Sequence, residues 1–394
     1  MQASSTVFSQ ITSVLYPTEF SRCFRQFPTQ RVTRRFTAYD QFLCLCFGQL
    51  TYRESLRDVV SCLRAKRTLH YHLGLRGHIT RTNFAYANRH RDWRLFRALA
   101  QILMRRASAL YATTPSDPDW PQVAYALDSS IISLSLNLFP WGFYARSQQA
   151  AVKLHLLLSL QGNLPAWAAI TDAHFQDMKI LDRVPKIPGA YYIMDRGYLD
   201  FIRLFDLHQS GTYFVIRNKR HVKFRVLCSH PVNKQTGLRC DQIIRLTSSW
   251  SLKSYPQQLR RIRLYDAQNR LSLVLLTNQF ELPAQVIAQL YQQRWQVELF
   301  FKWIKQHLRI RGFYGRTPNA VHCQIWSAIC AYLMVAIVKK RLGIPKTMYE
   351  ILQIVSVNTF EQVPLSELLT ETLPPPYHSD INDDAQNLLP LNNI

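Results

Sequence analysis

Residues 291–305 read YQQRWQVELFFKWIK, a mostly apolar helix pattern that carries one narrow charged stripe. At about 100° per residue, the stripe falls within an arc of about 80° on the helix. Its members are Tyr291, Arg294, Glu298, Lys302 and Lys305. The other directions are taken by Trp295, Val297, Leu299, Phe300, Phe301, Trp303 and Ile304. Because apolar side chains surround most of the helix, the pattern predicts a helix packed on most sides.

Charged residues are rarely enclosed in a protein unless they are paired or bound to a ligand. In this stripe an acid is flanked by bases along roughly 20 Å of helix, which suits a metal ion bound beside successive phosphates. The alternative is a ladder of salt bridges within the helix, because Arg294, Glu298 and Lys302 follow one another at four-residue spacing.

The charge balance of the whole chain points to a polyanionic partner. Lys and Arg number 48 against 25 Asp and Glu, a net charge of +23, and nucleic acid is the commonest partner of such a surface. An anionic membrane is the alternative, but the basic residues are scattered rather than gathered on one amphipathic segment. The longest apolar run, 325–338, is shorter than the roughly 20 residues of a spanning helix and predicts a buried one. We therefore expect no membrane partner and no secretory signal.

Cysteine usage favours a reducing compartment. The eight cysteines include no CxxC pair, which predicts reduced and mostly buried thiols in a cytoplasmic protein. Cys228, His230 and Cys240 offer three zinc ligands, but their spacing fits no strong pattern and a fourth ligand is missing.

The first part of the chain reads as helical from residue 8 to about 112. Apolar periodicity predicts one helix at 38–63 and another at 91–111. The segment 64–94 between them is dense in Arg, Lys and His, with Tyr, Phe and Trp interleaved. This mixture suits phosphate contact and base stacking, and a solvated basic face with core aromatics is the alternative.

The pattern then changes to short strands, after a loop at 113–122. Strands are expected in QVAYALD, AVKLHLLLSL, LPAWAAIT, AYYIMD and GTYFVIR, with a hairpin signal at Gln161-Gly162-Asn163. Helices are expected near 177–184 and at 198–209. A meander of strands followed by alternating elements predicts an α/β layer.

The remainder of the chain interrupts and then completes this layer. A basic, strand-rich stretch that follows the fifth strand looks like an insertion before the core strand LSLVLLTN. A long helix is expected from Glu281 onward and a further one at 319–342. The proline-rich and then acidic end predicts a loosely ordered tail.

Two acids end neighbouring strands of the expected layer. Asp128 ends QVAYALD and Asp195 ends AYYIMD, and acids at the carboxyl ends of adjacent strands point into one crevice. Glu298 from the striped helix completes a cluster whose mutual repulsion a hard divalent cation removes. Two Mg²⁺ ions at such a cluster suit in-line phosphoryl transfer. For each Asp taken alone, a capping role is the alternative.

Other polar residues near the crevice carry weaker expectations. Lys153 and His155 alternate on one strand, and a hydrogen-bonded strand histidine is favoured over a crevice-facing one. Arg196 follows Asp195 and is expected either to contact DNA or to neutralise the acids. Asp172 and Asp177 are interpreted as structural, since capping explains an Asp before a helix.

These residues together resemble a known enzyme family. The spacing of Tyr291, Arg294, Glu298 and Lys305 matches the Tyr, Arg, Glu, Lys signature of DDE transposases of the insertion-sequence-four family. The segments LDSSIISLSLNLFPW, AVKLHLLLSLQGNLPAWAAITDAHFQD and YYIMDRGYLDF are similar to the family's blocks around its first two acids. The likeness runs from about residue 8 to 370.

The resemblance implies a fold and a set of roles. It implies an RNase H-like α/β fold with Asp128, Asp195 and Glu298 as catalytic, metal-binding residues, and Mn²⁺ as a substitute for Mg²⁺. It implies phosphate contacts from Tyr291, Arg294 and Lys305 near the cleaved end. We also expect Lys302 and Arg196 to contact DNA. Family members stack a flipped base on an aromatic residue, for which Trp250 is a candidate here, although core packing is favoured for it.

The resemblance also implies how the chain is divided. We expect a helical DNA-binding domain at 1–113, which binds terminal inverted repeats, and the RNase H-like core at 114–217 and 271–345. A β-rich insertion is expected at 218–270, and a helical segment with a loosely ordered tail at 346–394.

The expected function is DNA transposition. The protein is expected to bind the double-stranded ends of its own element as a homodimer, cleave them by metal-dependent hydrolysis and join the 3′ ends to target DNA. We expect it in the bacterial cytoplasm, associated with the nucleoid. The alternatives are an RNase H-like nuclease or resolvase without strand transfer, and a catalytically dead DNA-binding repressor.

Overall fold

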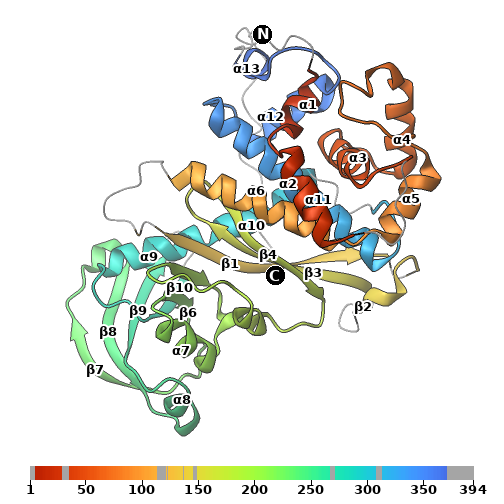
Figure 1. The fold of residues 1–394 in the computed structure, drawn as a ribbon. Helices are drawn as coiled ribbons and strands as arrows, with labels where there is room; N and C mark the ends of the chain where they lie inside the picture. Colours follow the sequence, from red (N-terminus) through yellow and green to blue (C-terminus); the bar gives the residue numbers. More distant parts are fainter. Residues whose placement is uncertain are drawn as a thin grey trace, which may run out of the picture.

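The computed structural model of the chain describes residues 5–28, 35–112, 121, 123–135, 137–144, 149–266, 271–307 and 313–370. The expected tail at 371–394 and most of the expected loop at 113–122 lie outside these residues. Figure 1 shows helices gathered above one end of a long sheet and a strand-rich extension at its other end.

The chain begins with helices, as its periodicity predicts. They are α1 (Val7–Thr12), α2 (Pro17–Gln26), α3 (Ala38–Leu50), α4 (Leu56–Ala65), η1 (Arg67–Leu69), α5 (Arg81–His90) and α6 (Arg94–Ala112). The single helix expected at 38–63 is wrong, because it is divided into α3 and α4. Tyr52 between them has φ 55°, and Ser55 and Asp58 form a capping box that starts α4. Local capping thus overrides a continuous apolar face.

The strands form one mixed sheet of ten members. They are β1 (Ala124–Leu134), β2 (Phe143–Tyr144), β3 (Gln149–Ser159), β4 (Leu164–Asp172), β5 (Tyr191–Met194), β6 (Tyr213–Arg217), β7 (Phe224–His230), β8 (Leu238–Leu246), β9 (Leu259–Asp266) and β10 (Leu271–Thr277). The order is β2-β3-β1-β5-β6-β10-β9-β8-β7, with β4 beside β3.

The half of the sheet that contains β1 has RNase H-like topology. Strand β3 is antiparallel to both β1 and β4, whereas β5 is parallel to β1 and β6 is parallel to β5. The predicted hairpin between β3 and β4 is confirmed, since Gly162 and Asn163 adopt φ values of 78° and 53°. The helix expected at 177–184 is instead the short 3₁₀ helix η3 (Asp177–Asp182), because Pro185 disfavours helical backbone before it.

Strands β7 to β9, with helix α8 (Ser249–Ser254), occupy the interval where an insertion is expected. They do not form a separate sheet, because β9 pairs with β10 and β10 pairs with β6. A buried ion pair fastens this extension: Arg260 donates to Asp241 and also to the carbonyl oxygens of Gln279, Phe280 and Leu282. The extension therefore holds the segment that leads into the next helix.

The remaining helices cover the sheet or pack on the N-terminal helices. They are η2 (Pro140–Gly142), η4 (Arg196–Tyr198), α7 (Phe201–Gln209), η5 (Lys234–Thr236), α9 (Ala284–Gln293), α10 (Trp295–His307), α11 (Pro318–Arg341), α12 (Met348–Asn358) and α13 (Leu365–Thr370). In Figure 1, α7 lies below the sheet, whereas α6 and α10 lie above it.

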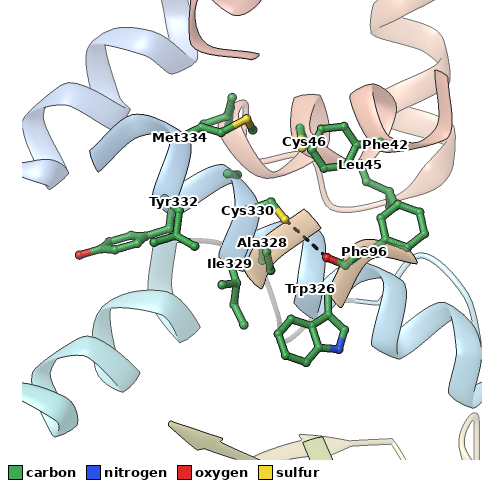
Figure 2. Close-up of a cluster of buried hydrophobic side chains, with 14 of the residues drawn as sticks. Phe42, Leu45, Cys46, Phe96, Trp326, Ala328, Ile329, Cys330, Tyr332 and Met334 are labelled. Carbon is green, nitrogen blue, oxygen red and sulfur yellow. Dashed lines mark hydrogen bonds between the residues drawn. The ribbon is translucent and has the colours of Figure 1, made fainter. Parts of the chain in front are cut away.

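Helix α11 is the centre of the largest hydrophobic cluster. Its apolar side chains pack against α3 and α6. Figure 2 shows Cys330 beside Phe96, whose carbonyl oxygen accepts a hydrogen bond from the Cys330 thiol. Among the described residues this helix alone is long and apolar enough to cross a bilayer, but 94% of its apolar window is buried within the protein. The predicted buried helix at 325–338 is thereby confirmed. The same cluster includes residues of α1, β1 and α10, so the N-terminal helices and the sheet share one core.

Candidate active site

Asp128 and Asp195 occupy matching positions on adjacent parallel strands. Leu127 of β1 is in register with Met194 of β5, and each Asp is the next residue in its chain. The expectation that Asp128 ends its strand is wrong, since β1 continues to Leu134 through its pairing with β3. What ends at this point is the parallel pairing with β5. A crevice thus opens beside β1 where β5 stops.

The alternation of side chains aims both aspartates at the same face of the sheet. Leu127 and Met194 belong to the cluster on the α7 face. Ala126 packs in the cluster that contains α10 residues, and Ile193 packs in the cluster that contains α9 residues. Asp128 and Asp195 follow the same parity as Ala126 and Ile193, so their carboxylates lie on the side of α9 and α10.

The striped helix is divided at Arg294. Helix α9 ends at Gln293 and α10 begins at Trp295, with three-residue hydrogen bonds from the Arg294 amide to Tyr291 and from the Val297 amide to Arg294. The long continuous helix expected from Glu281 is therefore wrong. The tightened turn moves Arg294 relative to the residues that follow it.

The expected burial around α10 is only partly right. Val297, Phe300, Phe301 and Ile304 are buried, but Trp295 and Leu299 are 55% and 42% exposed. Positions 295 and 299 are one turn apart, so one apolar edge of the helix faces solvent.

Arg294 connects the helix to the sheet. Its Nη2 donates to Glu298 Oε1 at 2.6 Å, and its Nη1 lies 3.7 Å from Asp128 Oδ2. The first contact is the intrahelical pair that the four-residue spacing predicts. The second brings the Asp128 and Glu298 carboxylates to one guanidinium group, although they are remote in sequence.

Burial is the main influence on the carboxyl of Asp128, and charges of both signs lie near it. Burial raises the pKa of the Asp128 carboxyl to about 6, and the nearby charges of Glu298 and Asp195 add to this rise. The Ser129 amide and Arg294 act in the opposite direction. All three acids are therefore close enough to act on one another.

The two residues of the stripe that lie nearest to the acids, Tyr291 and Arg294, also have shifted pKa values. Burial raises the pKa of the Tyr291 hydroxyl, with a further rise caused by Asp195. Burial lowers the pKa of Arg294, but the charges of Tyr291, Glu298 and Asp128 outweigh that effect and raise it overall. Arg294 stays a cation at any pH at which the protein works.

A polar network supports β1 from the opposite face. Asp177 Oδ1 accepts hydrogen bonds from Ser129 Oγ at 2.6 Å and from Lys153 Nζ at 3.1 Å. His155 is fully buried, bonds Thr171 and has a pKa lowered to about 4 by burial. The favoured interpretation of His155 as a hydrogen-bonded strand histidine is confirmed.

Sequence reasoning missed the link between this network and the site. The Ser129 amide donates to Asp128 Oδ1 at 2.8 Å, so Asp177 holds the residue that follows Asp128. The sequence feature that pointed to this network was the alternation of Lys153 and His155 on β3. Their register partners on β1 are Ile131 and Ser129. Alternation alone did not identify Asp177 as their common partner.

The donor set fits a divalent cation in its chemistry, although it is not assembled around one. Asp128, Asp195 and Glu298 offer hard carboxylate oxygens, and the pKa of Asp128, raised chiefly by burial, shows that its charged form is poorly solvated. Within the described ranges no three His, Cys, Asp or Glu side chains converge closely enough to hold a metal ion. The guanidinium of Arg294 contacts two of the acids instead.

The weaker zinc expectation gains nothing from the structure. All eight cysteines are free thiols, five of them buried, as the sequence predicts. Cys228 is exposed on β7, and the described part of the chain contains no group of three metal-binding side chains around it.

The other residues predicted to contact DNA differ in their exposure to solvent. Arg196 is exposed in η4 directly after Asp195, and Lys302 is exposed on α10, whereas Lys305 is partly buried. Trp250 on α8 is 60% exposed, so the core packing favoured for it is wrong. Its only described ring neighbour is Phe201, at 6.5 Å between centroids.

Comparison with known proteins identifies two regions of the chain. Residues 119–334 match the family model described as the transposase DDE domain, and residues 3–76 match a domain of unknown function. The first region contains Asp128, Asp195 and Glu298, and the second contains most of the helices before α5.

Curated relatives carry matching names. The chain is 34% identical to a putative transposase of Sinorhizobium fredii, over 54% of this chain and 59% of that one. It is 29% identical to a probable transposase for insertion sequence element IS5377 of Geobacillus stearothermophilus, over 55% and 56%. A putative transposase for element IS4SA of Synechocystis is 26% identical over 71% and 77%. The chain thus spans somewhat over half the length of the first two.

One solved structure has a weak overall similarity to the chain at much lower sequence identity. It is a piggyBac transposase synaptic complex with hairpin DNA, with 10% identity and a TM-score of 0.42 over 96% of this chain and 85% of that one. A likeness this remote supports no inference about the chain.

Proposed function

Because the chain belongs to the transposase DDE-domain family, we propose that it is a DNA transposase that acts on the ends of its own insertion sequence. It binds the terminal inverted repeats, hydrolyses the phosphodiester bonds there and joins the freed 3′ hydroxyl groups to target DNA. The net charge of +23 suits such a partner, because phosphate contacts dominate affinity for duplex DNA.

The single observation that carries this proposal is that three acids from separate elements lie near one another, two of them acting on the charge of the third. Asp128 and Asp195 lie on matching positions of β1 and β5, and Arg294 ties Glu298 to Asp128. The charges of Glu298 and Asp195 both raise the pKa of Asp128, which supports one shared site. These three residues are the proposed catalytic residues.

The family uses divalent metal ions, and we assign Asp128, Asp195 and Glu298 as the residues that would hold two Mg²⁺ ions, with Mn²⁺ as a substitute. When bound, such ions supply Lewis acidity and a nucleophilic oxygen for in-line phosphoryl transfer. Arg294, which contacts two of these carboxylates, would also be placed to bind the DNA backbone beside the ions. In the metal-free protein the guanidinium serves as a counter-charge for the acids.

The basic side chains around the acids position the DNA. Lys302 and Lys305 lie along α10, Arg294 lies at the break before it, and Arg196 belongs to η4 beside Asp195. Tyr291 is 7% exposed, so its contribution is to orient the Arg294 guanidinium, which lies 5.8 Å from its ring, as well as to contact a phosphate. Two ends are handled by two copies, so the working form is a homodimer on DNA, in the cytoplasm at the nucleoid and without a membrane partner.

The decisive experiment uses the DNA that flanks the gene of this chain. The protein is incubated with both flanks and Mg²⁺, and cuts on both strands are mapped. The wild type is expected to cut at the element ends, whereas Glu298→Gln binds the same DNA without cutting it. Full cleavage by Glu298→Gln would contradict the assignment of Glu298.

The same experiment separates the two rival functions. A nuclease or resolvase leaves nicks but no strand-transfer products, so joined molecules exclude it. A repressor binds the ends without cutting them under any metal, and the contact of Arg294 with both Asp128 and Glu298 is the observation that keeps this second function in view.

A further inference from the structure

The helical region carries a basic pocket that the proposed active site does not use. The pocket has a volume of about 540 Å³ and lies between α4, η1 and the loop before α5. Its lining includes Arg64, Arg67, His70, Arg76 and His78. Three guanidinium groups and two imidazoles thus face one hollow.

The surroundings of the pocket contain unusually little negative charge. Residues 59–91 include seven Lys or Arg and no Asp or Glu. Among the described residues, no carboxylate lies within 4.0 Å of the guanidinium groups of Arg64, Arg67 or Arg76. Concentrated charge of one sign that lacks internal partners destabilises a fold by self-repulsion, unless an external anion offsets it.

The acid beside the pocket already has hydrogen-bond partners for both of its oxygens. Asp40 is buried, and its Oδ1 accepts from the amides of Arg76 and Gly77 while its Oδ2 accepts from Thr37. Asp40 therefore fixes the loop in place and leaves the charge of the arginine side chains for a ligand.

Two of the arginines are held in position by main-chain oxygens. Arg64 Nε donates to the carbonyl of Ile79 at 3.2 Å. Arg76 Nη1 donates to the carbonyl of Tyr71 at 3.2 Å, and its guanidinium lies 3.9 Å from the centroid of that ring. Each contact occupies one of five N–H groups, so most donors remain for an anion. A fixed guanidinium loses less entropy on binding than a mobile one.

We infer that this pocket is a clamp for backbone phosphates of duplex DNA. The pocket alone suits any phosphate, but the basic surface continues past it. Arg81 and Arg89 are exposed along α5, and Tyr71 is 70% exposed at the rim. A run of cations and an exposed ring beyond one pocket fits a polymer rather than a single small anion.

The clamp is rigidly connected to the catalytic core. Asn319 of α11 donates to the carbonyls of Asn88 and Arg91 at the end of α5. Tyr314, which precedes α11, donates to the carbonyl of Arg53 before α4. The contact at the pocket thus fixes the duplex relative to the acids. This inference rests on the proposed function, because it assumes that the chain acts on DNA.

The test measures DNA binding without catalysis. Full-length protein is titrated with a labelled duplex of its element end in EDTA, at several salt concentrations, and affinity is read by fluorescence anisotropy. The triple variant R64A/R67A/R76A is expected to bind about 10- to 100-fold more weakly and to reduce the salt slope by about 3, since each of the three lost phosphate contacts removes roughly 0.9. The control R22A/R25A/R105A removes three exposed arginines from α2 and α6.

A charge-preserving variant separates the clamp from misfolding. R64K/R67K/R76K is expected to regain most of the salt slope while staying weaker than the wild type, because Lys lacks the guanidinium fork. An unchanged slope in the alanine variant, or equal losses in the α2/α6 control, would overturn the inference. Stabilisation of the wild type by inorganic phosphate alone, with no change in DNA binding by the variant, would identify a small-anion site and also overturn it. Because EDTA prevents cleavage, failure of the proposed enzymatic function would leave these outcomes distinct.

Discussion

The guanidinium of Arg294 lies 3.7 Å from the carboxylate of Asp128, and it is the only described cation paired with that acid. The same group holds Glu298 at 2.6 Å. One basic side chain thus keeps two acids of the proposed metal site together before any metal is bound. The predictions below begin from this contact.

Removal of Arg294 should strengthen metal binding in the absence of DNA. In Arg294→Gln the acids lose their counter-charge, so a divalent cation meets no competitor. We expect Ca²⁺ or Mg²⁺ to bind about tenfold more tightly, equivalent to about 1.4 kcal/mol, in isothermal titration of the DNA-free protein. DNA-end cleavage should fall. Lys302→Gln, an exposed change about two turns further along the chain, should alter metal affinity much less. Weaker metal binding in Arg294→Gln would contradict this view of the arginine.

The ionised carboxylate of Asp128 should lower the free energy of unfolding of the metal-free protein at neutral pH. Burial raises its pKa to about 6 from 3.8, so the folded state favours the protonated form. Its stabilising contribution is present below the unfolded pKa and is lost as pH rises through about 6. Asp128→Asn should therefore raise the free energy of unfolding at pH 7 by about 1–2 kcal/mol while abolishing cleavage. The difference should vanish near pH 4 in urea denaturation, and a constant difference across pH would argue against the shift.

Loss of the buried Arg260–Asp241 ion pair in the β extension should lower the free energy of unfolding more than loss of an exposed ion pair. Arg260 and Asp241 are each 7% exposed, and truncation of either leaves a buried charge without a partner. Asp241→Ala should lower the free energy of unfolding by about 3–5 kcal/mol. Lys186→Ala, which removes an ion pair with the half-exposed Asp206, should cost about 0–1 kcal/mol. Chemical denaturation of both variants provides the comparison, and similar losses would refute it.

The hairpin glycine should tolerate substitution poorly for two separable reasons. Gly162 has φ +78°, and an added Cβ would lie 2.2 Å from Tyr111 Cδ1. Gly189 has φ +77°, but no described atom lies within 4 Å of its added Cβ. Gly189→Ala should therefore cost about 1–2 kcal/mol through backbone strain alone. Gly162→Ala should cost about 2–4 kcal/mol, because the clash with Tyr111 adds to the backbone strain. Thermal denaturation of both variants measures the two losses, and equal losses would show that the Tyr111 contact is unimportant.

Much of the architecture was accessible from local patterns. The N-terminal helices, the meander of β1, β3 and β4, the interval of β7 to β9 and the buried helix α11 all follow from periodicity and turn residues. Local breaks were less accessible. Tyr52 and Arg294 each interrupt a helix whose apolar face continues across the break, so periodicity alone joined α3 to α4 and α9 to α10.

The sequence by itself determined the spacing of Tyr291, Arg294, Glu298 and Lys305, and with it the family to which the chain belongs. It also determined that Asp195 follows a core strand, because strand composition is a local property. Only the tertiary structure decided that Asp128 and Asp195 share a row and a face, since register depends on pairing between distant segments. It alone placed Arg294 between two acids and left Trp295 in solvent, because burial is set by what packs against a helix and not by the composition of the helix itself.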